Sequence, residues 1–219
     1  MKRPKIILLL AILFPVLTAC DGDDFSSRIS EARSDLFYAQ TDEFSVTFSC
    51  VTREQPHLSD GIVGEKQSLV EISLRDFSSA DGYRIFFSYG ETEGGGETSF
   101  HTVKNEYYYE QSVKEFPTST VDLRIECGEH VREITATSVK NENTLSIEGA
   151  LEKMLEQRDE ALIPFTEDGE LHAEFYVRLL RREKNYYYVA IVGKNGNTHS
   201  FLLDGESGEI LAEREHPSV

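Results

Sequence analysis

The sequence predicts an α+β fold in which an N-terminal antiparallel β-sandwich is followed by one helix and an antiparallel β-meander. Apolar and polar residues alternate in short segments between residues 43 and 138, which is the period of strands with one buried face. No helix is expected between these strands, and this favours a sandwich. A helical stripe follows at residues 147–155, and alternation returns between residues 171 and 215.

The strands of the sandwich are predicted from this alternation. In EFSVTFSC, which begins at Glu43, four apolar residues from Phe44 to Cys50 share the inward face. In TVDLRIEC, which ends at Cys127, apolar residues alternate with charged ones. Further strands are predicted in LVEISL, YRIFFSY, TSFHTV, EYYYEQ and VREITATSV, and EGGGE is expected to form a hairpin tip. The arrangement resembles an immunoglobulin-like sandwich, although the chain has no Trp.

A short helix is predicted before the sandwich. Four apolar residues between Ile29 and Ala39 recur at helical spacing, so the helix would cover about residues 27–39. It would have to pack on the body of the protein to be stable. Residues 28–140 are therefore expected to form a first domain that contains this helix and the sandwich.

The second helix is predicted to begin after Ser146, whose side chain can cap it, and to end before Pro164. Strands are then predicted in LHAEFYVRLLR, YYYVAIVG, HSFLLD and EILAERE. Their connections REKN, KNGN and GESGE contain the Gly and Asn that tight hairpins need. We expect residues 145–216 to form a second domain.

This second domain resembles a PepSY-type module. That family has a helix followed by antiparallel strands, and its last hairpin commonly has an aspartate, a few turn residues, TGE and a hydrophobic strand. The matching residues run from Asp204 to Leu211, with Ser207 in place of threonine. The resemblance covers about a third of the chain and implies a role in restraining or modulating an extracellular peptidase.

The N-terminus resembles a bacterial lipoprotein signal. Basic residues precede an apolar run that is shorter than the ~20 residues of a spanning helix. The run ends in the lipobox-like stretch Leu17-Thr18-Ala19-Cys20. The resemblance implies that residues 1–19 are removed and that Cys20 carries a diacylglyceryl group with acyl chains such as palmitate. An ordinary signal peptide with a chance cysteine is the alternative.

The anchor would place the protein on the extracytoplasmic face of the cell membrane, with residues 20–27 as a short acidic tether. The whole layout resembles that of lipoproteins from Gram-positive bacteria. The formal net charge is −17, and removal of residues 1–19, which hold three basic residues and no acid, takes it to −20. Such a charge repels phosphate backbones, so nucleic acid is not an expected partner.

Two cysteines remain after Cys20, and both lie on predicted inward faces. An even pair in an exported protein suggests a disulfide between Cys50 and Cys127. It would close a loop of about 77 residues and stabilise the fold by ~4 kcal/mol in the chain-entropy model. Two buried free thiols are the alternative.

No catalytic, metal or cofactor site is predicted. GESGE does not fit the G-x-S-x-G pattern of a nucleophile elbow. No two of the six histidines lie three or four residues apart, as zinc ligands on one helix would. EGGGE lacks the Gly-Lys-Ser/Thr of a phosphate loop. We therefore do not expect an enzyme.

Two tyrosine triplets provide the candidate binding surface, because exposed aromatic ladders suit recognition. Tyr107 and Tyr109 share one face of a predicted strand, and so do Tyr186 and Tyr188. Packing between the domains is the alternative for the second triplet, since both faces of its strand are apolar.

The expected function is therefore non-catalytic binding of a protein or peptide partner at the membrane, with modulation of a peptidase as the specific form that the PepSY resemblance implies. The alternatives are a ligand-capturing lipoprotein of a transport system and an envelope structural or assembly factor.

Overall fold

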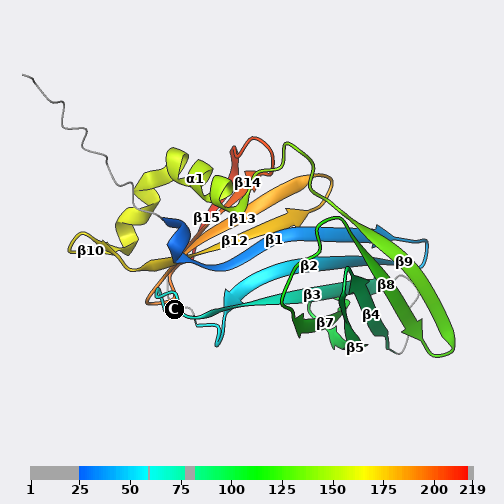
Figure 1. The fold of residues 1–219 in the computed structure, drawn as a ribbon. Coiled ribbons are helices and arrows are strands. Elements are labelled where there is room, and N and C mark those ends of the chain that lie inside the picture. Colours follow the sequence, from blue (N-terminus) through cyan, green and yellow to red (C-terminus); the bar gives the residue numbers. More distant parts are fainter. Residues whose placement is uncertain (1–24, 59, 77–81, 217–219) are drawn as a thin grey trace, which may run out of the picture.

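A computed structural model describes residues 25–58, 60–76 and 82–216. The predicted signal peptide, Cys20 and all but the last three residues of the predicted tether lie outside the described residues. Within the described part, thirteen strands form one sheet, and a two-stranded hairpin stands apart from it (Figure 1). No helix in the described ranges has the length and apolar character needed to span a membrane.

The first half of the chain supplies nine strands of the sheet. They are β1 (Ile29–Gln40), β2 (Phe44–Glu54), β3 (Lys66–Asp76), β4 (Arg84–Tyr89), β5 (Thr92–Glu97), β6 (Ser99–His101), β7 (Glu106–Ser112), β8 (Thr120–Cys127) and β9 (His130–Ser138). A short 3-10 helix, η1 (Phe25–Arg28), precedes them, and the Phe25 ring packs edge-on against the Phe175 ring with centroids 6.0 Å apart.

These nine strands curl into a nearly closed sheet around a first core. The order β1-β2-β3-β7 runs one way from β1, and the order β9-β8-β4-β5 runs the other way. The two arms meet where the Gly95 N–H of β5 donates to the Gln111 side chain of β7 at 3.1 Å. The first core contains residues that are almost wholly inaccessible to solvent, among them Phe37, Phe48, Ile72, Leu74, Ile85 and Leu123.

The second half of the chain extends the same sheet and covers it with a helix. Its elements are α1 (Ile147–Arg158), the 3-10 helix η2 (Asp159–Phe165), the hairpin β10 (Thr166–Glu167) and β11 (Glu170–Leu171), and the meander β12 (Ala173–Arg181), β13 (Asn185–Gly193), β14 (Thr198–Asp204) and β15 (Ile210–His216). Helix α1 lies on one face of the meander (Figure 1). Between them is a second core that includes Leu151, Met154, Phe175, Tyr187 and Phe201.

The predicted helix after Ser146 is confirmed. The Ser146 hydroxyl accepts a hydrogen bond from the Gly149 N–H at 2.9 Å, which satisfies one of the free donors at the helix start. The buried Tyr187 hydroxyl donates to the Leu145 carbonyl at 2.5 Å. This bond ties the start of α1 to the sheet beneath it.

The predicted α+β fold class, with an immunoglobulin-like sandwich followed by a separate PepSY-like helix and meander, is wrong. The described chain is mostly β, and its strands form one large, nearly closed sheet rather than two packed sheets and an α+β unit. The cause is β1, which pairs in parallel with β12 from Ile29 to Arg33 and antiparallel with β9 at Phe37 and Tyr38. These pairings join residues 99 to 146 positions apart in the chain, which local alternation cannot reveal.

The predicted helix at residues 27–39 is also wrong, because this segment is strand β1. The strand carries irregularities after Ile29 and after Arg33, and such bulges break the two-residue period. It also serves both cores, since Leu36 packs in the second and Phe37 in the first. The resulting spacing of apolar residues imitates a helix.

The EGGGE segment is not a hairpin tip but most of strand β5. Gly95 has φ of +133°, and a Cβ there would lie 2.2 Å from the Ile85 carbonyl oxygen. The glycines therefore allow β5 to lie against β4.

We expect Phe48→Ala to destabilise the protein by about 3–5 kcal/mol, because Phe48 is wholly buried and its ring contacts the rings of Phe37, Phe87 and Tyr89. Urea unfolding followed by circular dichroism measures the change. Phe100→Ala is the control, since Phe100 is 48 % exposed, and it should cost less than about 1 kcal/mol. Equal effects would contradict the assignment of the first core.

Candidate functional site

A groove opens beside the point where β1 exchanges one partner strand for another. The pairing with β12 ends at Arg33, and the pairing with β9 begins at Phe37. Beyond this point a groove forms. Arg181 at the end of β12 and Arg182 after it line one side, and the outer faces of β1, β2 and β3 line the rest. Two adjoining cavities of about 500 and 280 Å³ form it. Both are lined by Tyr38, Thr47, Ser73, Glu106, Arg181 and Arg182, and we call this feature the arginine groove.

The floor of the arginine groove is rich in hydroxyl groups. It follows from the alternation in β2, where Phe44, Val46, Phe48 and Cys50 pack in the first core and the residues between them face outward. Thr47 pairs with Ser73 across β2 and β3. The floor therefore offers hydrogen-bond donors and acceptors without a fixed charge. The hydroxyl residues are Ser45, Thr47, Ser49, Ser73, Tyr38 and Tyr108.

Three arginines line the groove without an ion pair to any described residue. The Arg181 guanidinium lies 3.9 Å from the centre of the Tyr38 ring, which holds it by a cation–π contact. Arg75 and Arg182 make no salt bridge within the described ranges. The chain has 39 acidic and only 22 basic residues, so arginines without carboxylate partners are unexpected.

The carboxylates in the groove are already neutralised. Glu71 accepts from Arg33 at 2.7 Å and from Arg53 at 3.0 Å. Glu106 accepts from the Ser73 hydroxyl at 3.3 Å and lies 3.8 Å from the Lys104 ammonium. The groove is consequently positive in a strongly negative protein. Guanidinium groups bind carboxylates through two parallel hydrogen bonds, so the arrangement suits an anionic group.

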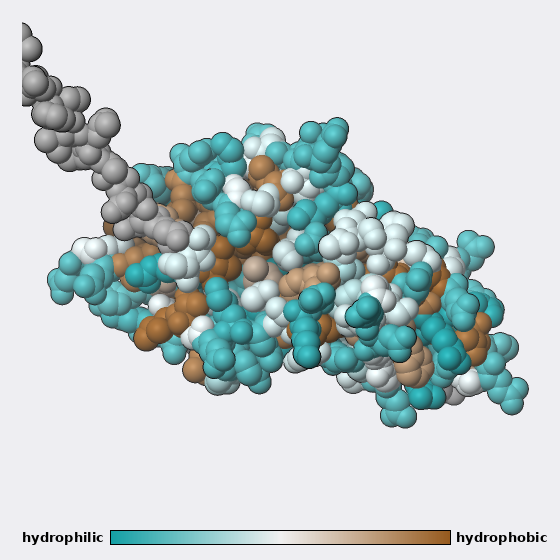
Figure 2. Space-filling model, viewed as in Figure 1, coloured by the Kyte–Doolittle hydropathy of each residue, from teal (hydrophilic) through white to brown (hydrophobic). Residues whose placement is uncertain are grey.

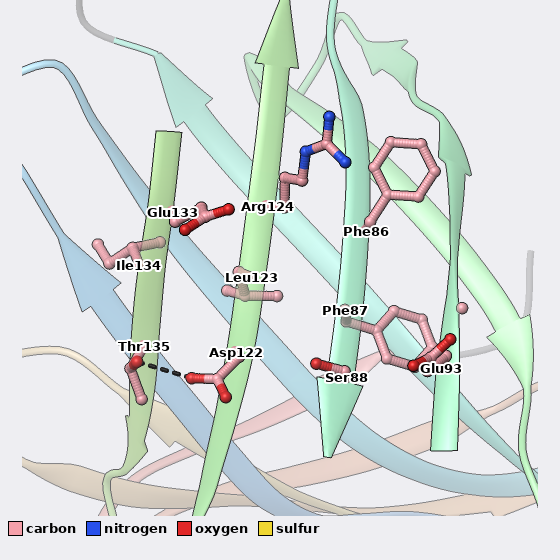
Figure 3. A pocket seen from close by; sticks show the side chains of 11 residues that line it. Phe86, Phe87, Ser88, Glu93, Asp122, Leu123, Arg124, Glu133, Ile134 and Thr135 are labelled. Atoms are coloured by element: carbon pink, nitrogen blue, oxygen red, sulfur yellow. Dashed lines mark hydrogen bonds between the residues drawn. The ribbon is translucent and has the colours of Figure 1, made fainter. Parts of the chain in front are cut away.

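A second hollow, of about 620 Å³, lies on the outer face of β4, β5, β8 and β9 (Figure 3). Its carboxylates, Glu93, Asp122 and Glu133, come from three different strands and do not converge on one point (Figure 3). Asp122 accepts from the Thr135 hydroxyl at 2.7 Å. Among the described residues, no three His, Cys, Asp or Glu side chains are placed to hold a metal ion. This hollow has the same sign of charge as the whole chain, which makes it the weaker candidate.

Comparison with known proteins adds no constraint to the site. No family model, curated protein or solved structure matches this chain. The resemblances of the N-terminus to a lipoprotein signal and of the C-terminal region to a PepSY-type module therefore stay predictions.

The structure does not bring the four predicted binding tyrosines together. Strand β7, with Tyr107 and Tyr109, is separated from β13, with Tyr186 and Tyr188, by four strands of the sheet. Tyr107 and Tyr109 are half-buried against the first core. Tyr188 is half-buried beside the Arg178 guanidinium at 5.8 Å, and Tyr186 lies 5.6 Å from the Lys184 ammonium.

Sequence reasoning missed the groove arginines. The alternation predicts Arg181 as the last residue of a strand and Arg182 as the first residue of a hairpin connection, and neither place indicates a binding role. The signal that could have found them is the run RLLRRE, in which three arginines occur within five residues of an acidic chain. On the face that Figure 2 shows, hydrophilic side chains cover most of the surface and hydrophobic ones form separate patches.

The predicted disulfide is not formed, and both Cys50 and Cys127 are free thiols. Cys127 lines a small cavity with Phe44 and Tyr83 at one end of the first core. Cys50 lies six residues from Phe44 along β2, which is about 20 Å at the rise of a strand. A disulfide needs Cα atoms about 4.4–6.8 Å apart. Burial, followed by the negative charge of Asp35, raises the pKa of the Cys50 thiol.

We expect the two thiols to react at very different rates with a thiol reagent such as iodoacetamide. Cys127 is partly exposed and should be alkylated in the folded protein, whereas Cys50 is buried and has a raised pKa, so it should react only after unfolding. Intact-mass analysis without a reducing agent measures both steps. An oxidised pair, seen as no added groups after denaturation, would contradict the structure.

Proposed function

We propose that the protein is a non-catalytic binding protein whose arginine groove receives an acidic segment of a protein or peptide partner. The observation that carries this proposal is the set of three arginines, Arg75, Arg181 and Arg182, that line one groove and have no ion pair within the described residues. In a chain with 39 acidic residues, compensation by the protein's own carboxylates would be expected if the arginines were only structural.

The chemistry of the groove fits a chain of carboxylates better than a single small ligand. The arginines lie along an open sheet face with hydroxyl groups between them, so successive acidic side chains and peptide groups can each find a partner. A hydrogen bond to a charged group contributes about 1.5–3 kcal/mol. The openness of the groove also disfavours capture of a small solute for a transport system, since such sites bury most of the ligand.

The strong negative charge of the rest of the chain would make binding of an acidic partner selective for the groove. An acidic partner is repelled by most of the surface and attracted only at the groove, which sets the orientation of binding and discourages other contacts. A lipid on Cys20 would restrict this encounter to the membrane surface. The PepSY resemblance implies that the partner is a peptidase. Measuring whether the purified protein inhibits secreted peptidases tests this specific form of the proposal.

We expect Arg182→Glu to weaken binding of a fluorescently labelled deca-glutamate peptide by at least tenfold, measured by anisotropy at 50 mM salt. Tenfold corresponds to about 1.4 kcal/mol, roughly one charge-assisted hydrogen bond. The matched control is Arg214→Glu, because it makes the same change of net charge on the exposed strand β15.

The control variant should change the affinity less than twofold. Equal weakening by both variants would show that only net charge matters, and the absence of binding to the unaltered protein at low salt would contradict the proposal. Binding should also weaken steeply as salt is raised, because the contacts are ionic and exposed.

We propose separately that Cys20 is lipidated, and we expect Cys20→Ala to abolish incorporation of an alkyne-labelled fatty acid in a bacterial host. A diacylglyceryl anchor requires this thiol, and two or more acyl chains give stable attachment. Cys127→Ala is the control and should keep the label. Label that persists in Cys20→Ala would contradict the lipoprotein prediction.

A further inference from the structure

Two buried carboxyl groups, on β2 and β12, flank strand β1 at the end of the sheet where β2 stops and β12 begins, and the charge of one acts on the other. Glu174 is fully buried, and Glu54 is 2 % exposed. One oxygen of Glu174, Oε1, accepts from the Tyr176 hydroxyl at 3.2 Å. The other oxygen, Oε2, is buried and has no hydrogen-bond partner in the described structure. An ionised carboxylate in this position would lack the hydrogen bonds that its charge needs.

The Glu54 carboxylate holds a segment that we call the strap, residues 60–65. Its Oε1 accepts from the Gly64 N–H, and the Gln55 N–H donates to the Glu65 carbonyl at 3.0 Å. Gly61 presses against the start of the meander, since a Cβ there would lie 2.8 Å from the His172 carbonyl oxygen and 2.9 Å from the Lys194 nitrogen. One end of the strap is therefore held by β2 through Gly64 and Glu65, and the other end packs through Gly61 against the backbone beside the meander.

Among the described residues, no basic group makes an ion pair with Glu54 or Glu174. The Lys66 ammonium donates to the Ile29 carbonyl at 3.1 Å, and the Arg28 guanidinium to the Ala173 carbonyl at 3.5 Å. The Arg178 guanidinium is engaged by Glu31 through two bonds of 2.6 and 2.7 Å. Charged and titratable groups surround Glu174 and the strap. They are Arg28 on η1, Glu31 on β1, Arg53 and Glu54 on β2, His57 before the strap, Asp60 and Glu65 on it, Lys66 on β3, His172 before β12, Tyr176 and Arg178 on β12, and Lys194 after β13.

We propose that Glu54 and Glu174 form a proton-operated latch, which holds the strap against the meander while Glu174 is protonated and releases the strap when Glu174 is ionised near Glu54. When Glu174 is protonated, its carboxyl group is neutral and its buried Oε2 carries no charge. Glu54 then keeps its own charge and its hydrogen bond from Gly64. Loss of the proton to solvent places two like charges in a buried site, and opening of the strap lets water reach them.

The direction of the pH dependence follows from the same groups. Burial, and then the charge of Glu54, raise the pKa of Glu174 from 4.5 to about 7. The closed state therefore binds more protons than the open state, so closure weakens as pH rises from about 4.5 and levels off above 7. This latch is independent of the proposed binding function of the groove.

Hydrogen exchange of the amides in residues 60–65 tests the latch in the full ectodomain. After correction for intrinsic exchange rates, protection should fall about tenfold between pH 6 and pH 8, as linkage gives for pKa values of 4.5 open and about 7 closed. Glu174→Gln cannot ionise, so its protection should stay constant over this range. The matched control is Glu170→Gln, an exposed residue of β11, which should behave like the unaltered protein.

Constant protection of the strap in the unaltered protein, or the same tenfold fall in Glu174→Gln, would overturn the latch. Glu54→Gln provides a second variant, because glutamine still accepts from Gly64 but lacks the charge that opposes ionisation of Glu174. Its fall in protection should begin at lower pH and be smaller. Carbon-13 NMR titration of the glutamate carboxyls in the unaltered protein should show one group that titrates near pH 7, and its absence would also refute the proposal.

Discussion

The structure depends on one constraint, which is that strand β1 pairs with two different sets of strands along its length. Its first half holds β12 in parallel, and its second half holds β9 antiparallel, while its other edge pairs with β2 throughout. Because one strand belongs to both arms, the two cores cannot form as independent units. The bulges in β1 turn successive apolar side chains toward one core or the other.

The same constraint explains where the charges lie. Where β12 is paired with β1, Glu31 on β1 neutralises Arg178 on β12, and Glu71 on β3 neutralises Arg33 on β1 and Arg53 on β2. Where β12 leaves β1, this pairing of charges ends, and Arg181 and Arg182 face a floor of hydroxyl groups. The positive groove is thus a product of the strand exchange as well as of local sequence.

The sequence contains local features of the fold but little about its assembly. Alternation in β2 and β8 and the cap at Ser146 are local signals, and the structure has these elements. The pairing of β1 with β12 joins segments about 145 residues apart, and no residue pattern marks it. Alternation predicts that Cys50 and Cys127 face inward, and both do contact the first core. It does not show how far along the core each residue lies, and the two thiols lie too far apart along it for a disulfide. Glu174 stands in an alternating strand like any exposed acid, and only the three-dimensional structure shows its burial.

The groove and the carboxyl pair lie at opposite ends of one strand, and this separates their chemistry. Glu174 is near the start of β12 and Arg181 is its last residue, which is about 23 Å at the rise of a strand. That distance exceeds the screening length of about 8 Å at physiological salt, so ionisation of the pair has little direct electrostatic effect on the groove. Coupling between them would have to pass through β12 itself, whose first part is fixed to β1 while its end is bound only to β13. The latch and the groove are therefore two separate features at opposite ends of β12.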